Sequence, residues 1–252
     1  MTHRDGELNP RQRLAYARHA MLVQLTHWTG QAGARLRQDR LERTALVSGR
    51  NPPDSRLARQ MLEQAREAYG PPLLGHCLRC WLWADLFAQL DGISYDPELL
   101  YVSCLLHDLG LTDAHRPAAG DQVGCFAVHG GRVARLLLVE EGAAPAFADR
   151  ADEAIALHMN VQVPLSSGAE AHLLHAAAHL DVAGIRAAEL PPPAVRRVLG
   201  LHPRDGFPAE FGRLMRREAA ERPASRAALG WRLGMRLPLT HNPIDRPSLT
   251  SP

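Results

Sequence analysis

Segments with helical spacing of apolar residues, separated by proline and glycine, follow one another through this chain and most restrict its fold. No segment alternates polar and apolar residues as a half-buried strand does, and β-branched residues are sparse. Clear breaks fall at Asn51-Pro52-Pro53, Gly70-Pro71-Pro72 and Asp91-Gly92. The sequence therefore predicts an all-α protein, with helices at about 54–69, 73–90, 96–107, 126–141, 145–158, 169–184, 191–200 and 207–236.

The order of these segments predicts one helical domain over residues 51–237. Residues 1–50 are expected to form an N-terminal helical arm, and residues 238–252, rich in Pro, Ser and Thr, a flexible tail. The chain has neither an apolar run of membrane-spanning length nor the apolar core of a signal peptide. We therefore expect a cytoplasmic protein without a membrane partner. The sequence leaves open whether it forms a homo-oligomer.

Arginine supplies all 29 basic side chains, because the chain contains no lysine. Mechanisms that need a Schiff-base, phosphate-loop or kinase-type lysine are therefore excluded. Residues 61–195 carry 7 arginines against 17 acidic residues, whereas both ends of the chain are basic. An acidic middle favours a cation over a polyanionic partner. With only 5% aromatic residues, we expect no nucleic-acid partner.

An adjacent His107 and Asp108 end the apolar helix that begins near Asp96, and Gly110 is predicted to stop that helix. A neutral imidazole and a carboxylate at one helix end can both bind a divalent cation. Taken alone, the pair could equally be a local cap and a surface histidine. The metal hypothesis therefore depends on partners elsewhere in the chain.

His76 is the first candidate partner. Arg79, Cys80 and Trp83 follow it on the same helix face and form a polar stripe among apolar residues, which is typical of a face turned to a cavity. The alternative is a core histidine that bonds a backbone carbonyl.

Three further candidates lie later in the chain. His158 ends a helix on its apolar face, and Asp181 lies among alanines, where a buried acid needs a cation or a strong donor. His129 precedes Gly130-Gly131, which would permit close approach of another backbone or a ligand.

Two competing metal sets are less favoured. His172, His175 and His179 share a helix face, but the glutamate of the zinc-protease motif is missing, so we interpret them as core or surface histidines. Cys77 and Cys80 lie mid-helix without the turn of a zinc knuckle, so the cysteines are expected to be buried free thiols; the four are Cys77, Cys80, Cys104 and Cys125.

The ordered set of motifs over about residues 53–243 resembles the HD superfamily of metal-dependent hydrolases, and within it the cyanamide hydratase-like branch. This resemblance implies an HD-type helical bundle with a metal site in its centre. The matching motifs are Pro53-Asp54-Ser55, His76 with Arg79, Tyr95-Asp96, LLHDLGLT at 105–112, Phe126 with Gly130, EAIALH at 153–158 and HLDVAG at 179–184.

By this resemblance, four residues would ligate one divalent cation, namely His76, His107, Asp108 and Asp181. His158 would be a ligand of a second metal or an acid/base. His129 departs from the branch pattern and leaves open a second metal held with His158 and a bridging Asp108. Leu111 stands where several phosphodiesterase members have lysine, which weakens the case for a phosphodiester substrate. Zinc or iron is the expected ion, with manganese as an alternative.

The leading hypothesis is a metal-dependent hydrolase or hydratase that adds activated water to a small molecule. Asp108 or His158 would handle the proton, and Arg79 would orient either a ligand group or an anionic part of the substrate. The loop 113–125 is expected to cover the site. Three alternatives stay open: a phosphohydrolase of nucleotides or phosphate monoesters that uses Arg79 and Arg116, a di-iron oxygenase that uses His129, and a non-catalytic ligand-binding domain.

Overall fold

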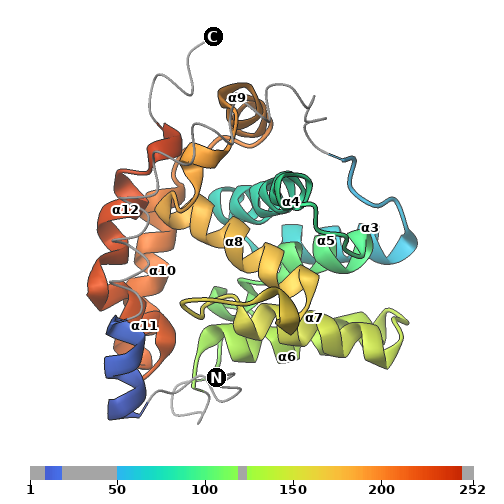
Figure 1. Ribbon diagram of the computed structural model, residues 1–252. Helices are drawn as coiled ribbons and strands as arrows, with labels where there is room; N and C mark the ends of the chain where they lie inside the picture. Colours follow the sequence, from blue (N-terminus) through green and yellow to red (C-terminus); the bar gives the residue numbers. More distant parts are fainter. Residues whose placement is uncertain (1–8, 19–49, 119–123, 246–252) are drawn as a thin grey trace.

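The computed structural model places three helices in the middle of a helical bundle (Figure 1). The residues that it describes are 9–18, 50–118 and 124–245. Within these ranges the chain contains helices and no strand, so the all-α prediction is confirmed. The three central helices are α4 (Pro71–Asp91), α5 (Pro97–Leu106) and α8 (Ala169–Ala183). Buried side chains occur on every face of α4, as expected of a helix surrounded by others.

The remaining helices enclose this centre. On one side, α6 and α7 pair with each other, and on another α10, α11 and α12 lie beside the helical residues 10–18 (Figure 1). No helix in the described ranges is both long and apolar enough to cross a bilayer. The outer elements are α3 (Arg56–Ala68), α6 (Phe126–Glu140), α7 (Pro145–Leu157), α9 (Pro192–Leu201), α10 (Phe207–Glu221), α11 (Arg226–Gly230), a π-helical turn (Trp231–Met235) and α12 (Arg236–Thr240); short 3₁₀ turns occupy Leu109–Leu111, Leu165–Ser167, Ala187–Glu189 and Pro243–Asp245.

Side-chain caps explain several of these boundaries. Ser55 accepts a hydrogen bond from the Ala58 amide at the start of α3, and Asp96 caps α5. Helix α6 has no cap of its own, but the buried Glu218 of α10 accepts a hydrogen bond from the Phe126 amide at 3.1 Å. This carboxylate satisfies an otherwise unpaired amide at the positive end of α6 and ties α10 to α6.

The structure differs from the predicted flexible tail over residues 238–245. Leu239, Asn242 and Ile244 are each at most 2% exposed, and the Asn242 amide donates to the Leu180 and Asp181 carbonyls at the end of α8. These contacts hold the segment in the bundle. Residues 246–252 and most of the expected N-terminal arm lie outside the described residues, so the division into an arm and a hydrolase domain stays a prediction.

Gly110 matters for a different reason from the one predicted. Helix α5 already ends at Leu106, and Gly110 lies in the following 3₁₀ turn without a positive φ. A Cβ atom at Gly110 would collide with the backbone of Phe126, and a Cβ atom at Gly130 would lie 3.0 Å from the Gly110 nitrogen. The turn after His107-Asp108 therefore touches the first turn of α6 backbone to backbone, which both glycines permit.

Gly110→Ala is expected to lower the free energy of unfolding by about 1–3 kcal/mol, because the methyl group forces these two backbones apart. Urea denaturation followed by circular dichroism measures the change. Gly200→Ala is the matched control: a Cβ atom added to Gly200, which lies in α9, would have no heavy atom within 4 Å. Alanine should therefore stabilise that helix by about 0.5–1 kcal/mol. Equal effects at the two glycines would contradict the close contact.

Candidate metal centre

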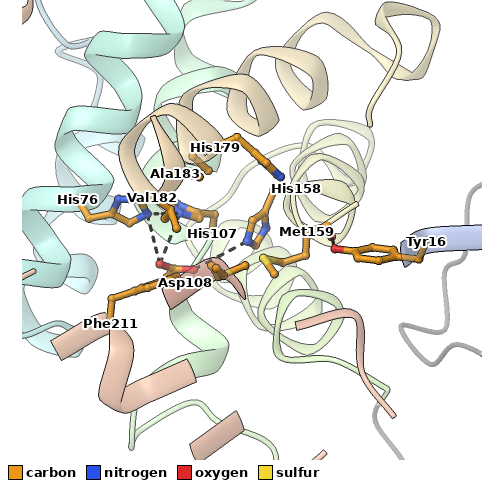
Figure 2. A pocket seen from close by; sticks show the side chains of 12 residues that line it. Tyr16, His76, His107, Asp108, His158, Met159, His179, Val182, Ala183 and Phe211 are labelled. Carbon is orange, nitrogen blue, oxygen red and sulfur yellow. Dashed lines mark hydrogen bonds and ion pairs between the residues drawn. The ribbon is translucent and has the colours of Figure 1, made fainter. Parts of the chain in front are cut away.

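Side chains from three helices meet in the middle of the bundle (Figure 2). His76 comes from α4, His107 and Asp108 follow α5 directly, and His158 follows α7. Each of the four is at most 2% exposed. The donor atoms of His107, Asp108 and His158 all lie within 4.8 Å of one another, as do those of His76, Cys80 and His107. The structure thus brings together four residues that the sequence singles out.

The ring nitrogens that face the centre of this cluster are hydrogen-bond acceptors. His107 Nδ1 donates to the Cys104 carbonyl at 2.8 Å, and His76 Nδ1 donates to Asp181 Oδ2 at 2.7 Å. These acceptors assign the Nδ1 proton in both rings, so each Nε2 carries a lone pair. The two Nε2 atoms are nevertheless 3.1 Å apart. Two lone pairs at this distance require a cation or a proton between them.

Asp108 completes the set. Its Oδ2 atom lies 3.6 Å from Nε2 of His76 and 3.6 Å from Nε2 of His107, and it is buried without a hydrogen-bond partner. Atoms that share one zinc ion at about 2.1 Å lie about 3.0–3.4 Å from one another. Two imidazole nitrogens and one carboxylate oxygen at these distances therefore fit a divalent cation such as zinc or iron.

The contacts of Asp181 differ from those expected of a direct metal ligand, the role predicted for it. Its Oδ1 accepts hydrogen bonds from Arg79 Nε and Trp83 Nε1, both at 2.8 Å, and its Oδ2 accepts from Arg79 Nη2 and His76 Nδ1. With four donors on its two oxygens, Asp181 lies behind His76 rather than beside His107 and Asp108. A carboxylate in this place fixes the tautomer of the histidine and makes its Nε2 a better ligand.

The electrostatics of this carboxylate agree with the hydrogen bonds. Burial alone would raise the pKa of Asp181, but the Arg79 guanidinium and His76 hold that pKa well below its usual value. The acid is therefore ionised and paired. The predicted stripe of His76, Arg79 and Trp83 on one face of α4 is confirmed, since all three contact the same carboxylate.

Arg79 is a positioning residue and not a substrate contact. Its side chain is fully buried, and beyond the two bonds to Asp181 it donates to the carbonyls of Pro203 at 2.8 Å and His202 at 3.3 Å. Four of its five N–H groups are used in these bonds, and the side chain does not line the cavity, so it is not presented to an anionic substrate. Of the two roles predicted for Arg79, orientation of a ligand group is the one that its contacts support.

His158 presents an acceptor to the cluster. Its Nδ1 donates to the Ile155 carbonyl at 2.7 Å, and its Nε2 lies 3.9 Å from Asp108 Oδ1. Burial lowers the pKa of His158 well below its ordinary value, so the ring is neutral at pH 7. A neutral Nε2 can take up a proton or join His107 and Asp108 around a second cation.

His129 does not join the cluster. It is half-buried on α6 and belongs to neither group of close donor atoms. Phe126, one turn earlier, contacts the His158 ring edge-on at 5.6 Å. The inward arc of α6 continues through Gly130 and Ala134, and His129 falls outside this arc. The prediction that Gly130-Gly131 permits close approach is confirmed, since Gly110 packs against the first glycine and Asp152 against the second.

A cavity of about 50 Å³ opens on the cluster. Its walls are mostly apolar, and among the described residues Asp108 is the only charged group apart from the histidines. The described parts of the loop 113–125 contribute nothing to these walls, and residues 119–123 lie outside the described residues. The lining residues are Tyr16, His76, His107, Asp108, His158, Met159, Ala178, His179, Val182, Ala183, Phe211 and Met235.

Most of these wall residues escaped prediction, among them His179, Tyr16 and Met235. His172, His175 and His179 each bond a backbone carbonyl through Nδ1, as expected of core or surface histidines, but His179 also reaches the cavity. The sequence could have indicated this position for His179, because His179, Val182 and Ala183 lie on one face of the same helix. No sequence signal pointed to Tyr16 or Met235, because both come from segments far from the ligand motifs.

The four cysteines are buried free thiols, as predicted. Cys80 lies one turn from His76, with Sγ 3.7 Å from Nδ1. Burial raises the pKa of the Cys80 thiol well above its ordinary value. Without a cation this thiol is therefore neutral, and its Sγ belongs to the same group of close donor atoms as His76 and His107.

Part of this chain is similar in sequence to two yeast hydratases. Over 113 residues the chain is 34% identical to cyanamide hydratase DDI2 of Saccharomyces cerevisiae, and equally to cyanamide hydratase DDI3 of the same yeast. This chain is a distant homologue of these two enzymes. The aligned part covers 44% of the chain and 49% of each relative, so the chain spans about half the length of the curated relatives it matches. No protein-family model matches the chain.

The distant homology agrees with what the resemblance implies for the fold. The helices are arranged as a bundle, and the histidine–aspartate cluster lies buried at its centre, as in an HD-type architecture. The predicted resemblance to cyanamide hydratase-like proteins is confirmed at the level of distant homology. The activity of this chain rests on the chemistry of the site.

Proposed function

We propose that this protein is a metal-dependent hydratase or hydrolase of a small molecule, with cyanamide or a similarly small nitrile as the substrate. One observation supports this most: Nε2 of His76, Nε2 of His107 and Oδ2 of Asp108 form a buried group of acceptors without a donor. A divalent cation held there would lower the pKa of a water molecule from ~15.7 towards ~7 and make it a nucleophile at neutral pH. Homology to two hydratases supports an enzymatic role.

The chain itself supplies proton transfer and exclusion of solvent. The neutral Nε2 of His158 faces the cavity and is placed to accept a proton from water during addition. Phe211, Met159 and Met235 give the cavity apolar walls, which strengthen electrostatic interactions inside it. Addition of water across the C≡N bond of cyanamide gives urea: the oxygen of the water becomes the carbonyl oxygen, and both of its protons end on the former nitrile nitrogen.

The size of the cavity favours a small substrate. One ordered water needs about 10–15 Å³ by this measure, so a cavity of about 50 Å³ admits a molecule of only a few heavy atoms. Nucleotide-sized ligands occupy pockets of about 300–1,000 Å³. No arginine lines the cavity among the described residues, because Arg79 pairs with Asp181 and Arg116 with Glu221. A phosphohydrolase is therefore the weaker candidate.

A two-metal oxygenase has one observation in its favour. His107, Asp108 and His158 could hold a second cation beside the first. His129, which the sequence offered as a further ligand, does not belong to this group. The number of ions that the protein binds separates the two candidates.

The test loads the metal-free protein separately with zinc, iron(II) and manganese and measures the ion content of each sample. Each is then assayed for urea formation from cyanamide, for phosphate release from phosphate monoesters and nucleotides, and for oxygen uptake. One ion per chain with urea formation supports the proposal. Phosphate release, or two irons with oxygen uptake, overturns it. The His241→Gln variant controls for ions bound by an exposed histidine. His241 is exposed at the end of α12, so its replacement should leave the ion content unchanged.

A further inference from the structure

Residues from two distant segments line the end of the cavity away from His76. Tyr16 projects from the helical residues 10–18, and Met235 ends the π-helical turn that follows α11. Figure 2 shows the Tyr16 ring reaching towards Met159, on the opposite side of the cluster from Phe211. The wall that limits the length of the cavity is therefore separate from the elements that carry the ligand candidates.

Tyr16 is held in this wall by specific contacts. Its hydroxyl donates to the Met159 carbonyl at 3.3 Å. A Cβ atom on Gly230 would lie 3.6 Å from this hydroxyl and 3.1 Å from the Met235 methyl, so glycine leaves room for both side chains. Burial raises the pKa of Tyr16 to about 12, which keeps the phenol protonated and able to donate. On the same helix Leu14 is 63% exposed, so Tyr16 lies on the side that meets the bundle.

From this arrangement we infer that Tyr16 and Met235 set the upper size limit for the substrate. The inference rests on the proposed function, because it concerns which nitriles the site admits. The two side chains occupy the space into which a substrate longer than cyanamide would extend from the cation. Neither of them belongs to the groups of donor atoms that would hold the ion, so truncating either one should change selectivity and leave ion binding unaltered.

The first experiment compares kcat/KM for benzonitrile with kcat/KM for cyanamide in the full chain. Tyr16→Ala and Met235→Ala are each expected to raise the ratio at least about tenfold, the size of effect that pocket contacts of one or two methylene groups produce. Leu14→Ala, on the exposed side of the same helix, should leave the ratio unchanged. Melting curves confirm that the variants are folded, and Met235→Ala tests the wall independently of the N-terminal helix.

A second measurement does not depend on turnover. The cobalt(II)-loaded protein is titrated with azide and with 4-phenylimidazole, and the visible spectrum of the ion reports binding. Tyr16→Ala and Met235→Ala should tighten 4-phenylimidazole about tenfold and leave the azide affinity unchanged. Unaltered selectivity of both variants in both measurements overturns the inference. Relaxed ligand selectivity together with no hydration of any nitrile, in the variants and in the unmodified protein, overturns the proposed function and leaves the size limit standing.

Discussion

Asp108→Asn is expected to lower the affinity for the divalent cation, and the rate of hydration with it, by at least about 100-fold. Loss of a residue that merely orients a ligand already costs about 10–100-fold in affinity, and Asp108 offers the oxygen closest to both histidine nitrogens. Isothermal titration with zinc and the urea assay measure the two effects. Asp113→Asn is the matched control, because Asp113 lies in the same loop with its side chain 82% exposed and pairs with Arg217.

In the absence of a cation, Asp108→Asn should increase the stability of the protein, although it weakens ion binding. Without a cation, the buried Oδ2 of Asp108 has no hydrogen-bond partner, and a neutral amide removes the cost of burying an unpaired charge. In excess chelator, Asp108→Asn should therefore raise the free energy of unfolding by about 1–2 kcal/mol, measured by urea denaturation. With zinc present, the unmodified protein should be the more stable of the two. If the variant is instead less stable in chelator, then a protonated histidine already pairs with Asp108 in the metal-free protein.

Arg79→Met is expected to lower the free energy of unfolding by about 3–5 kcal/mol, because it leaves the Asp181 carboxylate buried and charged without its main partner. For a chain of this length the melting temperature should fall by ~2–4 °C for each kcal/mol. Arg186→Met is the matched control. Arg186 forms a pair of the same geometry with Asp91, at 2.8 and 2.9 Å, but both side chains are partly exposed. Its loss should cost less than the loss of Arg79, because solvent reaches both partners of this pair.

A second substitution, Asp181→Asn, tests whether the unpaired charge of Asp181 causes this loss of stability. In the Arg79→Met/Asp181→Asn double variant no charge is left unpaired, so part of the lost stability should return. The pH dependence has a defined sign. The pKa of Asp181 is held well below its unfolded value, so its contribution is complete above that unfolded value and disappears as the pH falls through the lower folded value. Equal losses at Arg79 and Arg186 would contradict the role of burial.

The sequence predicts the helices and the central ligand pair well, because both are local properties. Ser55 and Asp96 cap helices where breaks and capping residues coincide, and the His107-Asp108 pair ends its helix as expected. The position of Asp181 is a different case. An acid among alanines predicts a buried partner, but only the folded chain decides between a cation and Arg79 with Trp83.

The glycines and the far wall of the cavity were beyond sequence analysis for a related reason. The sequence pattern favours a helix stop at Gly110, whereas its role depends on the Phe126 backbone, which approaches it from another helix. Tyr16 and Met235 reach the cavity only because Tyr16 bonds to the Met159 carbonyl and the π-helical turn packs against α10. Periodicity along one segment contains no information about which distant segment will face it.

The contact between Gly110 and Gly130 has a practical consequence for engineering. The backbones at Gly110 and Gly130 touch, so both ends of the segment between them are held at nearly one point. Extra residues inserted there would add little entropy cost, since closing a loop of twice the length costs only about 0.6 kcal/mol more. A fluorescent reporter or an affinity tag inserted beside the exposed Ala114 should therefore leave the ion-binding centre undisturbed.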